Sequence, residues 1–198
     1  MERLKLALTS PGAAAEAALA FAIAEDLGRA ESLAQDINKR FPLDTQMQSL
    51  WLPTIRAQLA LDENHPDLAL NELQAASRTE LGIVPFVANL SCLYSTYVRG
   101  EAYLAEAQGS TAAAEFQRIL DHSGMVWNCW TGALARLGVA RASALEVKTS
   151  QGADAARVTA LAAYKDFLAL WKDADSDIPI LKEAEAEYAK LLGGHLTR

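Results

Sequence analysis

The chain has 198 residues, enough for one large domain or for a short array of stacked helical pairs, and either can bury a sizeable core. Its formal net charge of −7 argues against a nucleic-acid partner, because neutralising phosphates needs clusters of Lys and Arg. Hydrophobic residues make up 51% of the chain, aromatic residues only 7%, and 39 residues are Ala, which favours closely packed helices over a sheet sandwich. We therefore expect an all-α fold.

The N-terminal region begins like a signal peptide but does not continue as one. Arg3 and Lys5 precede an apolar stretch that Pro11 and Glu16 interrupt and Asp26 ends. We interpret this region as an amphipathic helix. Since no segment has the roughly 20 uninterrupted apolar residues of a membrane span, we expect a soluble domain with no direct membrane insertion.

Turn-forming residues between apolar stretches divide the chain into nine predicted helices. The helices are expected at about residues 11–25, 28–40, 45–61, 67–77, 86–108, 111–121, 129–147, 154–171 and 178–192. The segment 148–152 is predicted to be a loop. The last helix has Asp177 as its predicted N-cap and carries one apolar face, so we expect it to cap the array.

The two cysteines, Cys92 and Cys129, are predicted to be buried free thiols. They have no C-x-x-C spacing and no nearby histidine that could complete a zinc site. This interpretation leaves the redox compartment open, and no metal or cofactor is expected.

Small residues recur at a fixed separation of twelve positions. The three pairs are Ala18 and Ala30, Ala57 and Ala69, and Gly100 and Ala112. A fourth pair, Gly138 and Ala160, is 22 positions apart, and its surplus residues are expected around the 148–152 loop. These pairs predict four helical units, the last of them stretched.

The segment 97–120 carries the repeat most clearly. There Gly100, Tyr103, Ala112 and Phe116 match the G-x2-Y and A-x3-F elements of the tetratricopeptide repeat (TPR). The whole chain resembles the TPR superfamily, which implies a right-handed α-solenoid of stacked antiparallel helix pairs. A single domain, 1–198, would then hold units at about 11–42, 45–81, 86–124 and 129–172 and a cap at 177–192.

The segments 97–120 and 171–191 also resemble the C-terminal helical region of bacterial serine/threonine protein kinases and related multidomain signalling proteins. The resemblance lies in the sequence segments YVRGEAYLA, AAAEFQRILDH and FLALWKDADSDIPILKEAEAEYAKL. The chain has no Gly-rich phosphate loop, H-R-D or D-F-G, so any kinase activity would lie in a domain absent from it. The resemblance implies a sensing or docking region, either cytoplasmic or in the extracytoplasmic tail of a membrane-anchored protein.

Four positions depart from the repeat pattern. Thr96 and Arg99 stand where Trp and Leu are common, Gly124 replaces the closing Pro, and Arg141 replaces the Tyr of the fourth unit. These departures predict an irregular superhelix but leave the helical pairing intact.

No active site is predicted, so we do not expect an enzyme. The histidines are far apart and lie in predicted turns or the tail, where solvated or capping roles are expected: His65, His122 and His195. Asp173, Asp175 and Asp177 match the D-x-D-x-D start of a calcium-binding loop. However, Ile178 stands where that loop requires Gly, and Ala184 stands where it requires a bidentate Glu. Helix capping is the preferred reading of these aspartates.

The candidate functional residues lie on the inner helix of the second and third pairs, which lines the concave groove of this fold. The predicted partner-binding groove comprises Trp51, Thr54, Gln58, Leu61, Tyr94, Tyr97, Glu101 and Leu104. Tyr and Trp suit such a face because they offer large contact area and a polar group. The alternative is that Trp51 and Tyr97 are core residues between repeats. Trp127 and Trp130 are likewise read as core or capping residues, with a ligand site as the alternative.

These features predict a non-catalytic scaffold that binds an extended protein or peptide segment of unknown identity through apolar and hydrogen-bonding contacts. A small-molecule sensor is the alternative, and it would need an enclosed apolar pocket with a few convergent polar groups. A further alternative is self-association, in which an exposed apolar patch is buried in a homodimer.

Overall fold

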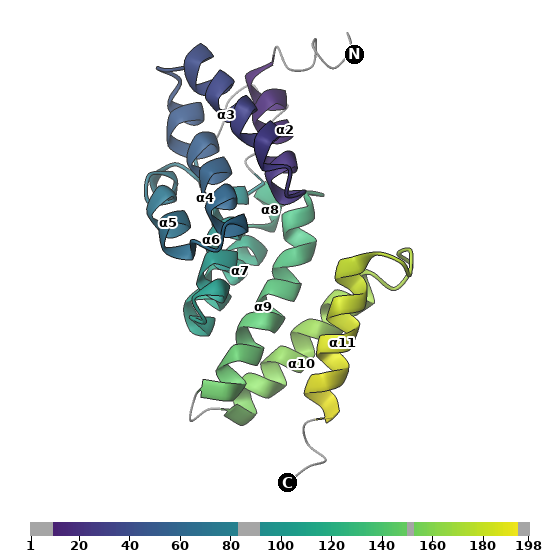
Figure 1. The fold of residues 1–198 in the computed structure, drawn as a ribbon. Helices are drawn as coiled ribbons and strands as arrows, with labels where there is room; N and C mark the ends of the chain where they lie inside the picture. Colours follow the sequence, from purple (N-terminus) through teal and green to yellow (C-terminus); the bar gives the residue numbers. More distant parts are fainter. Residues whose placement is uncertain (1–9, 83–91, 150–152, 194–198) are drawn as a thin grey trace. The chain divides into compact units, whose positions relative to one another are not determined.

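The computed structural model describes residues 10–82, 92–149 and 153–193, and within these ranges the chain is helical with no strand. The predicted all-α class is therefore confirmed. The chain divides into two compact units, residues 1–102 and 103–198, where the sequence predicts one domain (Figure 1). None of the helices in the described ranges combines the length and the apolar character that crossing a membrane requires.

The first unit is built from helices that pack on their neighbours in sequence. Its elements are α2 (Pro11–Ile23), α3 (Leu27–Arg40), the π-helix η1 (Met47–Trp51), α4 (Leu52–Asp62), α5 (Pro66–Glu72), the 3-10 helix η2 (Ala76–Arg78) and most of α6 (Tyr94–Ala105). Helix α2 packs on α3 and α4, and α4 packs on α3 and α5. Pro53 has no N–H to donate to the α-helical hydrogen-bond pattern, and the π-helix η1 ends two residues before it.

The second unit repeats this sequential packing. It contains α7 (Gly109–Asp121), α8 (Ser123–Val126), α9 (Trp130–Thr149), α10 (Ala153–Leu170) and α11 (Pro179–Gly193). Helix α9 packs on α7 and α10, and α10 packs on α11. Leu137, Tyr164, Phe167 and Leu181 form the centre of the apolar cluster that joins α9, α10 and α11.

The small residues that define the predicted repeat are all buried. They are Ala18, Ala30, Ala57, Ala69, Gly100, Ala112, Gly138 and Ala160. The residues four positions after the second member of each pair are buried as well: Ala34, Leu73, Phe116 and Tyr164. The sequence spacing therefore identified interior positions correctly in every unit.

Three helix ends share one turn geometry. Glu25, Asn64 and Ala107 each adopt a left-handed conformation, with φ of 58°, 60° and 56°. Each lies seven residues after the first small residue of its pair and five before the second. In each turn the N–H of the following residue donates to the carbonyl five positions back, and the left-handed residue donates to the carbonyl three back, which is the Schellman motif. The repeat thus extends to backbone hydrogen bonding.

The contact between Gly138 on α9 and Phe116 on α7 shows why a glycine occupies the fourth unit. A Cβ added at Gly138 would lie 2.5 Å from atoms of the Phe116 ring, which is fully buried. The ring occupies the space that any side chain at this position would need. Glycine is therefore required here for the close approach of the two helices.

A buried ion pair holds the end of η2 against α6 within the first unit. The Glu80 side chain is fully buried, and Arg99 is 7% exposed. Arg99 Nη2 donates to Glu80 Oε1 at 2.8 Å, Arg99 Nη1 donates to Oε2 at 3.1 Å, and the Ser95 hydroxyl donates to Oε2 at 3.1 Å. A charged pair taken out of water is tolerated only with such complete hydrogen bonding.

Several expectations from the sequence are corrected. Both cysteines, Cys92 and Cys129, are disulfide-bonded and not free thiols. Lys148 and Thr149 belong to α9, so the predicted loop begins later, and residues 150–152 lie outside the described ranges. The first N–H groups of α11 donate to the Ile178 carbonyl, which makes Ile178, and not Asp177, the N-cap.

Most predicted helix bounds agree with the structure to within a few residues. The helix predicted at 67–77 is divided, because α5 ends at Glu72 and the 3-10 helix η2 follows at Ala76. For the helix predicted at 86–108, the described part, α6, begins at Tyr94, and residues 83–91 lie outside the described ranges.

Replacing Gly138 by Ala is expected to lower the free energy of unfolding by about 1–3 kcal/mol, although Ala is the better helix former, because the Phe116 ring must move. Urea denaturation followed by circular dichroism measures this. Gly28→Ala is the control, since no atom lies within 4 Å of its added Cβ, and it should leave stability unchanged or raise it. Equal stability of the two variants would show that the Phe116 ring does not oppose a side chain at position 138.

Replacing Glu80 by Leu is expected to cost about 3–5 kcal/mol, because it leaves the buried Arg99 guanidinium without this carboxylate. Adding Arg99→Leu should recover most of that loss, since apolar side chains of similar size can replace a buried pair. Guanidinium denaturation of wild type, both single variants and the double variant gives the coupling energy. A double variant no more stable than Glu80→Leu would contradict this account.

Candidate functional site

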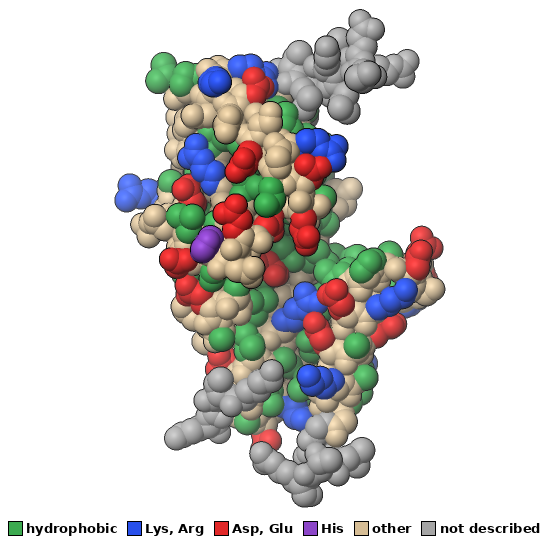
Figure 2. All heavy atoms as spheres, viewed as in Figure 1, with side chains coloured by type: hydrophobic (Ala, Val, Ile, Leu, Met, Phe, Trp, Pro, Cys, Tyr) green, Lys and Arg blue, Asp and Glu red, His purple; other side chains and the backbone are tan. Residues whose placement is uncertain are grey.

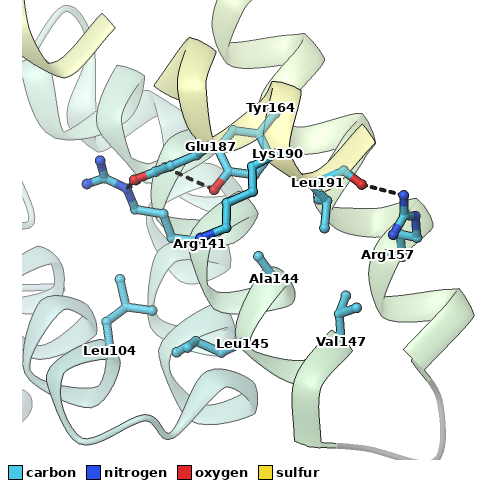
Figure 3. A pocket seen from close by; sticks show the side chains of 10 residues that line it. All are labelled: Leu104, Arg141, Ala144, Leu145, Val147, Arg157, Tyr164, Glu187, Lys190 and Leu191. Atoms are coloured by element: carbon cyan, nitrogen blue, oxygen red, sulfur yellow. Dashed lines mark hydrogen bonds and ion pairs between the residues drawn. The ribbon is translucent and has the colours of Figure 1, made fainter. Parts of the chain in front are cut away.

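The second unit contains a hollow of about 460 Å³ that opens to solvent (Figure 3). Its walls come from the C-terminal end of α6 and from α9, α10 and α11. The lining residues are Leu104, Arg141, Ala144, Leu145, Val147, Arg157, Tyr164, Glu187, Lys190 and Leu191. This volume is within the range of small-ligand and side-chain binding pockets.

Helical spacing places one charged and one apolar residue of α9 and of α11 on the same side of the hollow. Arg141 and Leu145 are four residues apart on α9, and Glu187 and Leu191 are four residues apart on α11. Leu104, on the last turn of α6, adds a further apolar side chain. The hollow thus has apolar walls with charged groups one helical turn away.

A hydrogen-bonded network crosses the hollow from α9 to α11 and α10. Arg141 Nε donates to Glu187 Oε2 at 3.0 Å, and Arg141 Nη2 donates to Glu183 Oε2 at 3.1 Å. The Tyr164 hydroxyl donates to the same Glu187 oxygen at 2.9 Å. Figure 3 shows Glu187 between Arg141 and Tyr164. The Arg141 charge is therefore matched by two carboxylates of α11.

The environment of Tyr164 strongly favours its neutral form. Burial of the phenol, followed by the charge of Glu187 and the hydrogen bond to it, raises the pKa of Tyr164 well above its ordinary value. The Arg141 charge opposes this shift but is the smaller effect. Tyr164 is therefore a hydrogen-bond donor at neutral pH and not an acid or a nucleophile.

Two other cations border the hollow. Arg157 Nη2 donates to the carbonyl oxygens of Leu191 and Leu192, the latter at 3.2 Å, and so caps the C-terminal end of α11. Lys190 is exposed on the last turns of α11. Within the parts of the chain that the structure describes, no carboxylate lies within ion-pair distance of Arg157 or Lys190.

Of the predicted groove residues on η1 and α4, two are buried. Trp51 belongs to the core cluster of the first unit and packs against Tyr94, with ring centroids 5.7 Å apart, in agreement with the alternative that it is a core residue. The buried Thr54 hydroxyl donates to the Leu50 carbonyl at 2.7 Å. Gln58 is half-buried and donates to Asp62 Oδ1 at 2.9 Å.

The other predicted groove residues are half-buried. Leu61 packs against the second core cluster of the first unit, and Tyr94 packs against the first. Tyr97 and Glu101 follow on α6. Leu104 alone of the predicted set lines the hollow of the second unit. The structure therefore brings Trp51 and Tyr94 together and places Leu104 with residues that the sequence analysis did not select.

Sequence reasoning missed the charged residues of the hollow. The sequence analysis names Arg141 only as a departure from the repeat and does not select Glu183 or Glu187. In the structure both carboxylates bind Arg141, so these glutamates are more than a solvated face. A basic residue at an inner-helix position and a Glu pair on the following inner helix are the signal that could have identified this network.

The remaining candidates are scattered. Trp127 lies at the C-cap of α8 with φ of 47°, and its side chain is 77% exposed, so the interpretation of Trp127 as a core residue is wrong. Trp130 is half-buried at the start of α9. His65 is the exposed N-cap residue of α5, and His122 Nδ1 lies 2.7 Å from the Arg118 carbonyl oxygen. His195 lies outside the described ranges.

Among the described residues, no group of three or more His, Cys, Asp or Glu side chains is arranged to hold a metal ion. Comparison with known proteins finds no matching family model, no matching curated protein and no matching solved structure.

The raised pKa of Tyr164 predicts a loss of stability in alkaline solution. An unfolded tyrosine ionises near pH 10, so the contribution of Tyr164 is fully present below about pH 10 and is lost as the pH rises through the higher folded pKa. Tyr164→Phe should make the decline less steep, by up to about 1.4 kcal/mol per pH unit. At neutral pH it should cost about 1–2 kcal/mol for the lost hydrogen bond to Glu187.

Urea denaturation at several pH values between 8 and 11 measures both effects. Tyr188→Phe is the matched control, because the Tyr188 ring lies 6.1 Å from the Tyr164 ring in the same cluster. An unchanged alkaline slope in Tyr164→Phe would contradict the assignment of the effect to Tyr164.

Proposed function

We propose that this chain is a non-catalytic, TPR-like helical scaffold that binds a protein or peptide segment in the hollow between α6, α9 and α11. It would serve as the sensing or docking region of a larger bacterial signalling protein, such as a serine/threonine kinase. The observation that carries the proposal is the open hollow of about 460 Å³, with apolar walls and hydrogen-bonding groups at its rim.

A right-handed solenoid of antiparallel helix pairs is supported by the packing within each unit. Each helix packs mainly on its neighbours in sequence, as in α2, α3 and α4 or in α9, α10 and α11. The shared Schellman turns at Glu25, Asn64 and Ala107 support a common repeat unit. The buried small residues twelve positions apart support the same spacing.

Binding of an extended segment is supported by where the hollow lies. It is lined chiefly by α6 and α9, which open successive predicted pairs, and by the predicted cap α11. The opening helices of the pairs are where a solenoid presents its inner surface. The hollow is open and not enclosed, so a bound peptide can extend beyond it. Apolar side chains at Leu104, Leu145 and Leu191 would receive a side chain of the bound segment.

A small-molecule sensor is the second candidate. The same volume would hold a small ligand, and Arg141, Tyr164 and Glu187 converge on the hollow as the few polar groups that such a site requires. The open rim favours the peptide, because a buried small ligand normally leaves little of its surface exposed.

The disulfide-bonded cysteines favour an extracytoplasmic location for the region. Disulfides form and persist mainly in oxidising compartments and are rare in the cytosol. Since Cys92 and Cys129 are both oxidised, the extracytoplasmic tail of a membrane-anchored signalling protein is the better of the two locations that the resemblance allows.

The proposal predicts that peptides selected on this chain bind in the hollow. A library of random twelve-residue peptides displayed on phage is selected on the full chain, and single peptides are then measured by fluorescence polarisation. Ala144→Trp, which fills the hollow, should weaken their binding by about tenfold or more.

Ala162→Trp is the matched control, because Ala162 is exposed on α10 and does not line the hollow. Circular dichroism and thermal unfolding establish that both variants fold. Peptides that bind wild type and Ala144→Trp equally would move the binding surface elsewhere. If no peptide is enriched, but amphipathic small molecules raise the melting temperature of wild type and not of Ala144→Trp, the sensor is the better account.

A further inference from the structure

We propose that the segment bound in the hollow is acidic, with an apolar anchor side chain that enters the hollow and an Asp or Glu close to it that pairs with Lys190. This inference rests on the proposed function and specifies its ligand. The juxtaposition that carries it is an apolar hollow bordered by two cations that no carboxylate of the described chain neutralises.

The charges of the lining do not balance. Arg141, Arg157 and Lys190 are basic, whereas Glu187 is the only acidic residue among the described residues of the lining. The chain as a whole carries −7, so a basic site is a local departure from its composition. Figure 2 shows basic and acidic side chains close together over α11 on the visible face.

The three cations are not equivalent. Arg141 is bound by both Glu183 and Glu187, and its charge is therefore compensated within the fold. Arg157 donates to carbonyl oxygens at the end of α11, which carry no formal charge. Lys190 is exposed, and Figure 3 shows its side chain extending from α11 over the hollow. Lys190 is therefore the cation that can form a new ion pair with the smallest loss of existing contacts.

Glu187 is not available to neutralise Lys190. Its Oε2 accepts from both Arg141 Nε and the Tyr164 hydroxyl, at 3.0 and 2.9 Å. Moving this carboxylate towards Lys190 would leave the buried Tyr164 hydroxyl and the Arg141 guanidinium with fewer partners, which is costly. An incoming carboxylate is therefore the favourable complement of Lys190.

The apolar side of the hollow fixes the second feature of the ligand. Leu104, Leu145, Val147 and Leu191 offer side-chain carbon and no hydrogen-bonding group, so they accept an aliphatic side chain such as Leu, Ile or Met. Lys190 and Leu191 are adjacent on α11, so the apolar and charged contacts of the ligand lie close together. The motif is a large aliphatic residue with an acidic residue near it.

The peptide selection on the full chain tests this directly. We expect Asp and Glu, together with Leu, Ile or Met, to be enriched in the selected peptides relative to the unselected library. Lys190→Glu should weaken the binding of a selected acidic peptide by about tenfold. Lys182→Glu is the matched control, because it makes the same charge change on an exposed position of α11 outside the hollow, and it should weaken binding less than twofold.

The outcomes separate this inference from the proposed function. Selected peptides that lose binding in Ala144→Trp but show no acidic enrichment would overturn the inference and leave the scaffold proposal standing. Equal effects of Lys190→Glu and Lys182→Glu would overturn the role of Lys190. If no peptide is enriched on wild type over Ala144→Trp, both proposals fail.

Discussion

The close approach of helices at small buried residues is the constraint on which the rest of the structure depends. A helix pair can bury its apolar faces without voids only if one side of the contact contributes almost no volume. Gly138 shows the limiting case, because the Phe116 ring lies where a Cβ would be. This contact sets the position of α9, and α9 in turn carries Arg141 and Leu145 into the hollow. The geometry of the candidate site is thus a consequence of interior packing elsewhere on the same helix.

The ion pair of Glu80 and Arg99 shows how a departure from the predicted repeat pattern can be accommodated. That pattern predicts a Leu at the position of Arg99, and an apolar side chain there would need no partner. With Arg at this position, the chain supplies the fully buried carboxylate of Glu80, from the end of the preceding predicted unit. The pair contributes orientation more than net stability, because the cost of removing both charges from water offsets most of their attraction. The ion pair therefore fixes the end of η2 in its position against α6.

The sequence predicts the helices well and the long-range polar contacts poorly, for a physical reason. Helix ends and buried small residues depend on neighbours a few positions away, so Ala57 and Ala69 or the turn at Asn64 can be read from local spacing. The disulfide state of Cys92 and the pairing of Arg141 with Glu187 depend on distances in the folded chain. Spacing along the sequence contains no such information. The same reason explains why Leu104 alone of the predicted groove lines the hollow.

Helix α11 would join stability to the proposed binding in a way that a regular array would not. Its apolar side, with Leu181 and Ala184, completes the core of α9 and α10, as a terminal element must. The same helix contributes Glu187, Lys190 and Leu191 to the hollow. Since Arg157 and Arg141 both bond to α11, any ligand that displaces either arginine would also loosen the cap. Binding that engages Lys190 alone avoids this cost, which is why an exposed cation beside a compensated one is suited to recognition.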